Sequence, residues 1–158
     1  MKSKIKPYVV SIVIALAVGG ASAFLTMDSM NIYSEIETPP LAPPGFLFPI
    51  VWTILFVLMG ISAAMIYTSE NGNAQERRSA LKVYAASLGV NFLWSIVFFN
   101  FRAYLTAFVL LLLLLVLIIR TISEYRKIEP VAAYLQIPYA LWVTFAGYLN
   151  FAIWILNK

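Results

Sequence analysis

The sequence predicts an all-α integral membrane protein, a bundle of five transmembrane helices, and three observations carry this prediction. Hydrophobic residues make up 62% of the 158 residues and charged residues only 11%, whereas a soluble domain has roughly 45–50% apolar and about 25% charged residues. The mean hydropathy is +0.87. The charged residues fall between five long uncharged stretches. We therefore expect one membrane domain over residues 1–158, a multi-pass protein in contact with the lipid bilayer.

The composition also excludes several kinds of chemistry, because the chain contains no Cys and no His. Disulfides, thiolate nucleophiles, imidazole bases and the usual ligands of zinc and haem iron are all excluded, so we expect no metal site. The net charge of +4 is spread over short basic groups beside the hydrophobic stretches. This pattern is typical of membrane orientation rather than of nucleic-acid binding, and we expect no nucleic-acid partner.

The first expected span covers residues 7–27, after the basic segment MKSKIK. The basic start, the apolar run and the small residues at 21–23 also resemble a cleavable signal peptide. A helix of these 21 residues would reach about 31 Å, enough to cross the hydrocarbon core, whereas the apolar region of a signal peptide has about 7–15 residues. A retained first span is therefore favoured.

A loop with four prolines leads into the second expected span, residues 46–68. Prolines fix φ and lack a backbone donor, so the loop is stiff, and Gly45 lets the chain bend before the helix begins. A rigid loop joined to an aromatic helix indicates one half of a ligand site, to which the loop contributes Pro44 and Gly45. The aromatic residues in the first half of this helix are Phe46, Phe48, Trp52 and Phe56.

Three further spans complete the expected bundle. Asn71 and Gly72 mark a turn in the polar segment that precedes the third span. Arg102 alone separates the third span from the fourth, so these two helices must form a tight hairpin, and Pro130 suits the first turn of the last helix. The expected spans are residues 83–101, 103–120 and 131–156.

Basic residues predict the orientation of the spans. Nine of the eleven Lys and Arg residues fall on one side, and cytoplasmic loops carry an excess of these residues. The amino terminus is therefore predicted to be cytoplasmic, with the carboxyl terminus and the first loop outside, and a bacterial cytoplasmic membrane is expected. The nine residues are Lys2, Lys4, Lys6, Arg77, Arg78, Lys82, Arg120, Arg126 and Lys127.

Aromatic and polar side chains share single helix faces inside the spans, which contain no charged residue other than Arg120 at the end of the fourth. This absence argues against a charge-coupled pump. Spacings of three, four and seven residues place one group on the third span and another on the fifth, and both interhelical packing and the lining of a cavity remain open interpretations. The groups are Asn91, Trp94, Ser95 and Phe98, and Trp142, Phe145, Ala146 and Leu149.

Two kinds of smaller signal remain ambiguous. Asn91 and Asn150 carry amides that hydrocarbon does not satisfy, so each must bond to another helix or face a cavity. Two pairs of small residues fit small-xxx-small packing, either within one chain or across a homodimer. These pairs are Gly60 with Ala64 and Ala85 with Gly89.

The chain resembles the TspO/MBR family, the tryptophan-rich sensory or translocator proteins of the peripheral benzodiazepine receptor family, in three segments. In order they are PPLAPPGFLFPIVWTILFVLMG, NFLWSIVFF and PYALWVTFAGYLNFAIWILN. The resemblance covers essentially the whole chain. It implies a five-helix bundle with a site between the helices, under the first loop, for porphyrins and for isoquinoline carboxamide or benzodiazepine-type ligands.

The resemblance further implies a membrane receptor for tetrapyrroles such as protoporphyrin IX, with no cofactor required and the porphyrin as ligand or substrate. Light- and oxygen-dependent porphyrin breakdown is also implied, with Trp52 and Trp142 as the oxidisable catalytic residues, and enzymatic activity is left open. The alternatives are a carrier of tetrapyrroles or lipids without charge coupling, and a sensor that signals to a partner protein. The implied pocket comprises Tyr33, Trp52, Phe56, Asn91, Trp94, Ser95, Trp142, Phe145, Ala146 and Leu149.

The chain departs from the family pattern at Leu41, where a Trp is usual in the proline loop. We therefore predict a looser lid and expect Leu41→Trp to tighten porphyrin binding. The sterol-recognition pattern of animal members is also imperfect, because no basic residue follows Tyr148 before Lys158. Sterol binding is not expected.

Overall fold

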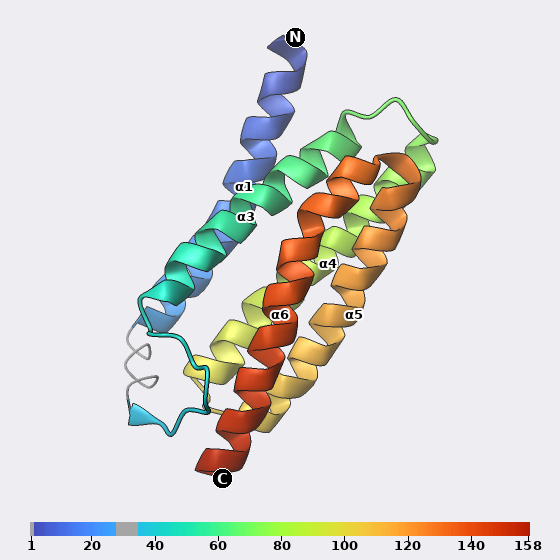
Figure 1. Ribbon diagram of the computed structural model, residues 1–158. Helices are drawn as coiled ribbons and strands as arrows, with labels where there is room; N and C mark the ends of the chain where they lie inside the picture. The colour runs from blue at the N-terminus through green and yellow to red at the C-terminus, as the bar shows by residue number, and fades with distance from the viewer. Residues whose placement is uncertain (1, 28–34) are drawn as a thin grey trace.

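The computed structural model describes residues 2–27 and 35–158, and this part of the chain is built from helices. Five of them are long and apolar enough to cross a membrane, which confirms the predicted all-α class and a multi-pass membrane protein (Figure 1). The helices are α1 (Lys2–Thr26), α3 (Leu47–Tyr67), α4 (Ala74–Phe99), α5 (Tyr104–Ile128) and α6 (Pro130–Asn157).

Two helices extend well beyond the apolar stretches that predicted them. α4 begins at Ala74 rather than at residue 83, because Asn73 caps it. The Asn73 side chain accepts a hydrogen bond from the Glu76 N–H at 2.8 Å, and the Glu76 carboxylate accepts one from the Asn73 N–H at 3.3 Å. α5 continues past residue 120 to Ile128. Hydropathy therefore locates the apolar part of a helix, whereas the cap at Asn73 decides where α4 begins.

Close contact between α1 and α3 depends on glycine. A Cβ atom on Gly60 would lie 2.6 Å from the Ile12 Cα, and one on Gly19 would lie 2.5 Å from the Phe56 ring. The small pair that begins at Gly60 therefore packs helices within one chain. Ala85 and Gly89, in contrast, are exposed on α4, and a Cβ atom on Gly89 would meet nothing within 4 Å.

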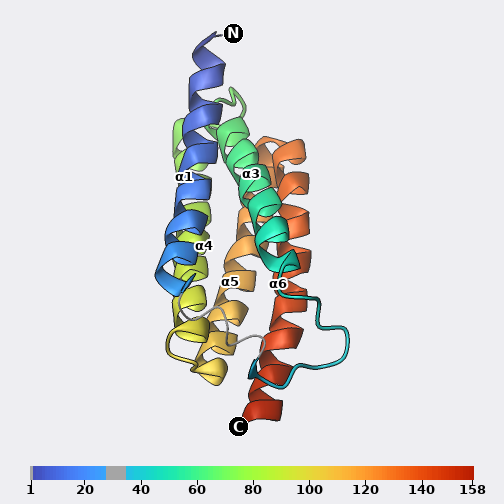
Figure 2. The same ribbon diagram turned by 90° about the vertical axis from the view of Figure 1, so that its left-hand side faces the viewer.

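The bundle has two distinct ends. The amino terminus, the α3–α4 loop and the α5–α6 turn lie at one end, and the proline loop, the α4–α5 hairpin and the carboxyl terminus lie at the other (Figure 1). Turned by 90°, the molecule shows α1 beside α3 and α4, with α6 on the far side of α3 (Figure 2). The two termini lie at opposite ends of the bundle, as the odd number of predicted spans requires.

The described part of the proline loop is tied to α6. The Asn157 side chain accepts a hydrogen bond from the Glu37 N–H at 3.0 Å and donates one to the Glu37 carbonyl at 2.9 Å. The Tyr148 hydroxyl donates to the Pro40 carbonyl at 2.7 Å. The Ala42 N–H donates to the Pro39 carbonyl at 3.2 Å. Side chains of the last helix therefore fix the backbone of the loop.

Candidate ligand-binding pocket

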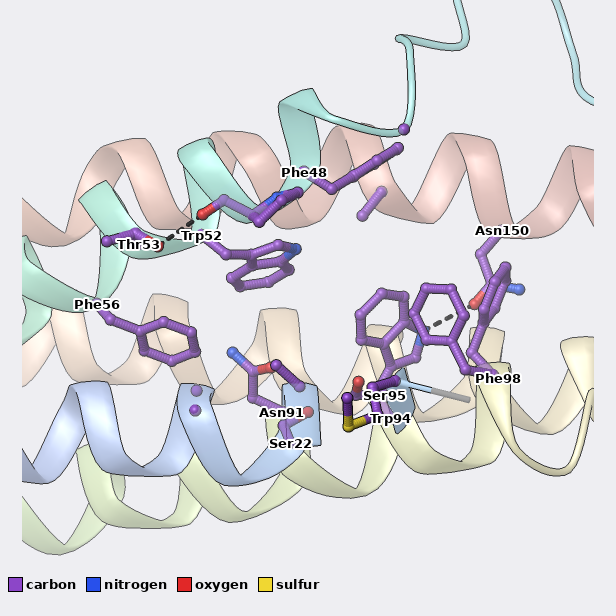
Figure 3. Close-up of a pocket in the computed structure, with 18 of the residues that line it drawn as sticks. Ser22, Phe48, Trp52, Thr53, Phe56, Asn91, Trp94, Ser95, Phe98 and Asn150 are labelled. Atoms are coloured by element: carbon purple, nitrogen blue, oxygen red, sulfur yellow. Dashed lines mark hydrogen bonds between the residues drawn. The ribbon is translucent and has the colours of Figure 1, made fainter. Parts of the chain in front are cut away.

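A cavity of about 700 Å³ lies between α1, α3, α4 and α6, at the end of the bundle that carries the proline loop (Figure 3). This volume is within the range of roughly 300–1,000 Å³ that is usual for small-molecule sites. Ten of the residues predicted for the site line it. They are Gly45, Phe48, Trp52, Phe56, Asn91, Trp94, Ser95, Phe98, Ala146 and Leu149.

Aromatic rings from α3 and α4 form the walls. Trp52 lies with its ring centroid 5.8 Å from that of Phe56 on its own helix and 6.1 Å from that of Trp94 on α4. Trp94 in turn lies 5.6 Å from Phe98. Figure 3 shows these rings facing one another across the space between the two helices. Such a slot offers flat, polarisable surfaces on which a planar guest can stack.

The Trp94 indole and the two asparagine amides at the wall are paired within the protein. The Trp94 indole N–H donates to the Asn150 side-chain oxygen at 3.0 Å, and the Asn150 amide donates to the Tyr104 carbonyl at 2.8 Å. The Asn91 amide donates to the Tyr139 hydroxyl at 2.9 Å. The sequence left open whether Asn91 and Asn150 bond to another helix or face a cavity. Each of them does both, since it bonds to a neighbouring helix and also lines the cavity.

Four predicted residues are not part of this lining. Pro44 is exposed on the loop, and Tyr33 lies outside the described residues. Trp142 lies behind the wall rather than in it, with its ring edge-on to Trp52 at 6.4 Å between centroids. Phe145 packs on Trp142 at 5.6 Å. Trp142 therefore contacts Trp52, which lines the cavity, but does not line the cavity itself.

The environment of Trp142 is unusual for an indole. Its ring contacts Phe48 at 5.8 Å as well as Trp52 and Phe145. Its N–H is buried and has no hydrogen-bond partner within the described ranges, although a buried indole N–H usually finds one. Trp142 therefore belongs to a cluster of aromatic rings that meet edge-on or tilted.

The first helix supplies a wall that the sequence reasoning did not include. Small side chains on α1 leave room for the cavity, and the pair Gly19-Gly20 inside an apolar span was the available signal, since glycine in a membrane helix often marks a close approach. The lining includes five residues of α1 and the residue that follows the helix: Leu16, Gly19, Gly20, Ser22, Ala23 and Met27. Other additions are Pro49, Thr53, Phe99, Asn150 and Ile153.

The chemistry available in the pocket is that of binding rather than of proton transfer. None of the lining residues is charged. Across residues 2–27 and 35–158, no cluster of His, Cys, Asp and Glu could hold a metal ion. Because every lining side chain is aromatic, aliphatic or neutral polar, the site suits a largely apolar guest whose charged groups, if it has any, remain at the mouth.

Comparison with known proteins agrees with these features. The model of the TspO/MBR family matches residues 11–155. A tryptophan-rich protein TspO from Archaeoglobus fulgidus is 39% identical, over 94% of this chain and 95% of its own. A tryptophan-rich sensory protein from Cereibacter sphaeroides is 34% identical, over 79% and 76%. A translocator protein from Ovis aries is 31% identical, over 85% and 80%. With its five membrane helices and this match, the chain belongs to the TspO/MBR family.

Proposed function

We propose that this protein is a membrane receptor that binds a tetrapyrrole such as protoporphyrin IX in the cavity between α1, α3, α4 and α6. The observation that carries the proposal is the uncharged aromatic slot of about 700 Å³, walled by Trp52, Phe56 and Trp94. Relatives named as sensory and translocator proteins support a receptor role.

A tetrapyrrole suits this slot for two physical reasons. Its macrocycle is flat and apolar, so indole and phenyl rings can stack on it. Its two carboxylates need water, and Gly45 places one end of the lining at the start of α3, beside the exposed proline loop. Isoquinoline carboxamide or benzodiazepine-type ligands share the flat aromatic character and would compete for the same space. No cofactor is needed for such binding.

Protoporphyrin IX titration with tryptophan fluorescence tests the binding proposal. Quenching should saturate, and Trp52→Phe should weaken binding about two- to tenfold, because an aromatic contact contributes roughly 0.5–1.5 kcal/mol. Trp154→Phe is the matched control, since Trp154 packs on Phe151 and does not line the cavity. Equal affinities in the two variants would argue against stacking on Trp52, and an absence of saturable quenching would end the proposal.

The edge-to-face contact between Trp52 and Trp142 favours a light-dependent reaction as an additional activity. The excited macrocycle would take one electron from the Trp52 indole, and dioxygen would add to the radical anion so formed. Trp142, edge-on at 6.4 Å, would share the positive charge left on Trp52 and so delay the return of the electron to the macrocycle before dioxygen adds. The dioxygen adduct would then give the electron back to the tryptophan pair, and both oxygen atoms would remain in the opened ring as two carbonyl groups. Under illumination Trp142→Phe should bleach the bound porphyrin more slowly than Trp154→Phe does. Equal bleaching rates would remove Trp142 from the reaction.

A carrier function uses the same cavity and is distinguished by flux. If reconstituted protein accelerates porphyrin uptake into liposomes, the receptor is also a carrier without charge coupling.

We place the basic end of the bundle, with the amino terminus, in the cytoplasm of a bacterial cell, and the proline loop outside. The exposed α4 face around Ala85 and Gly89 is where we place the contact of a homodimer.

A further inference from the structure

A second group of buried polar side chains lies beside the pocket, toward the end of the bundle that carries the amino terminus. Tyr84 and Ser87 share one face of α4 with Asn91, at spacings of three and four residues. Tyr125 comes from α5, and its ring centroid is 6.5 Å from that of Tyr84. The group continues onto α6 with Gln136 and Tyr139 and onto α3 with Ser62, and all of its members are buried.

Only part of this group is satisfied by hydrogen bonds within the protein. Asn91 donates to Tyr139 at 2.9 Å, and the Gln136 amide donates to the Ser62 hydroxyl at 2.7 Å. The hydroxyl oxygens of Tyr84 and Tyr125 and the side-chain oxygen of Gln136 have no partner in the described part of the chain. These three residues are 6%, 0% and 0% exposed, so bulk solvent cannot satisfy them.

Unpaired polar groups are costly at this place, because the surrounding helices cross the membrane and hydrocarbon offers no hydrogen bonds. One such atom could be tolerated as a local defect. Three of them belong to one connected group. Tyr84 packs on Tyr125, and Gln136 lies one turn of α6 before Tyr139, which bonds to Asn91 on the α4 face of Tyr84. Such a group indicates partners that the protein holds between its helices.

The chemistry of the three groups identifies those partners. A phenol hydroxyl both donates and accepts, whereas an amide oxygen only accepts. None of the residues in the group is charged, so an ion would gain no counter-charge, and an apolar guest would leave every group unpaired. Water both donates and accepts, and buried waters typically make about three hydrogen bonds to otherwise unsatisfied groups.

We propose that the bundle holds an internal water site bounded by Tyr84, Tyr125 and Gln136, separated from the ligand pocket by the Asn91–Tyr139 pair. Asn91 lines the pocket and also donates to Tyr139, so this pair is the boundary between an apolar binding cavity and a hydrated compartment. Water would therefore lie on the far side of the Asn91–Tyr139 pair from the ligand pocket, although the walls of the pocket are aromatic. This inference does not depend on which ligand the pocket takes.

Radiolytic hydroxyl labelling of the wild-type protein in ¹⁸O-water tests the proposal directly, because radicals formed from bound water label the side chains next to it. Tyr84 and Tyr125 should incorporate ¹⁸O at rates at least about tenfold above that of Phe108, which packs on Phe151. Exposed Tyr134 is the positive reference. Rates at either tyrosine no higher than that of Phe108 would overturn the proposal.

Thermal unfolding of Tyr84→Phe and Tyr125→Phe gives a second readout. If the hydroxyls bond to water, their removal should leave the unfolding temperature unchanged or lower. If they are dry and unpaired, removal relieves a penalty and should raise it by about 2 °C or more, which would contradict the proposal. Tyr134→Phe, at an exposed position, controls for the loss of a hydroxyl as such.

Discussion

Trp52 lies in the wall of the cavity, as its place on the helix predicted. Its position on an aromatic helix face predicted a wall residue, and the structure places its ring against four others. Trp142 carried the same kind of signal and shares its face with Ala146 and Leu149, which do line the cavity. Its own ring does not, because it packs against Phe48 and Trp52. Spacing along a helix defines a face but not what the face meets. The four rings around Trp52 are Phe56, Trp94, Tyr139 and Trp142.

Leu41 carries backbone strain that its sequence position did not reveal. It has a φ of 72° in the turn between Pro39 and Ala42, a conformation that glycine adopts freely and that costs other residues about 1–2 kcal/mol. Its side chain is 83% exposed and is absent from the cavity lining. The expectation that Leu41→Trp would tighten porphyrin binding therefore has no contact to support it.

We predict that Leu41→Gly stabilises the protein by roughly 1 kcal/mol, a rise of about 2–4 °C in unfolding temperature, because glycine relieves the strained φ. Thermal unfolding in detergent measures the change. Leu41→Ala is the matched control, since it shortens the side chain but keeps the Cβ atom responsible for the strain. If the two variants unfold at the same temperature, the strain at this turn does not contribute to stability.

At the scale of elements, α1 is the helix whose role the sequence left most open. Its apolar length predicted a span, but small residues carry no obvious binding signature, and only the packed structure shows that Gly19 and its neighbours line the cavity. The α1–α3 contact through Gly60 and Ile12 therefore does two things. It closes the bundle, and it holds one wall of the pocket in place.

Gly60→Leu should separate α1 from α3, because its side chain would overlap the Ile12 backbone, and overpacking of this kind costs about 1–3 kcal/mol. We expect a lower unfolding temperature together with weaker porphyrin binding. Gly147→Leu is the control, since an added Cβ atom there would come no closer than 4.0 Å to the Phe108 ring and Gly147 does not line the cavity. Equal stability and affinity in the two variants would show that α1 does not need close contact at Gly60.

The proline loop is an element whose attachment can be tested separately. Asn157→Ala removes two hydrogen bonds to the backbone of Glu37, each contributing about 0.5–1.5 kcal/mol. We expect faster amide hydrogen exchange in residues 35–42, measured by mass spectrometry. Asn73→Ala removes a side-chain bond at the opposite end of the bundle and should leave this exchange unchanged. Unchanged exchange in Asn157→Ala would show that the loop is held by other contacts.

At the scale of the whole molecule, the sequence was sufficient for the fold class and for the number of membrane helices, since both follow from where uncharged stretches long enough to cross a bilayer occur. Helix ends were less predictable, because the cap at Asn73 extends α4 beyond the apolar run. Much of the pocket could be predicted from faces on α3 and α4. The contribution of α1 could not, because it depends on which helices become neighbours.

The central claim is that the cavity between α1, α3, α4 and α6 is where a tetrapyrrole binds, and a cavity-filling pair of variants tests it most directly. Ala146 is buried and lines the cavity, whereas Ala21 is exposed on α1 and is not in the lining. In equilibrium titrations with protoporphyrin IX, Ala146→Trp should weaken binding by about tenfold or more, and Ala21→Trp should bind like the wild type. Wild-type affinity in a folded Ala146→Trp protein would contradict the account.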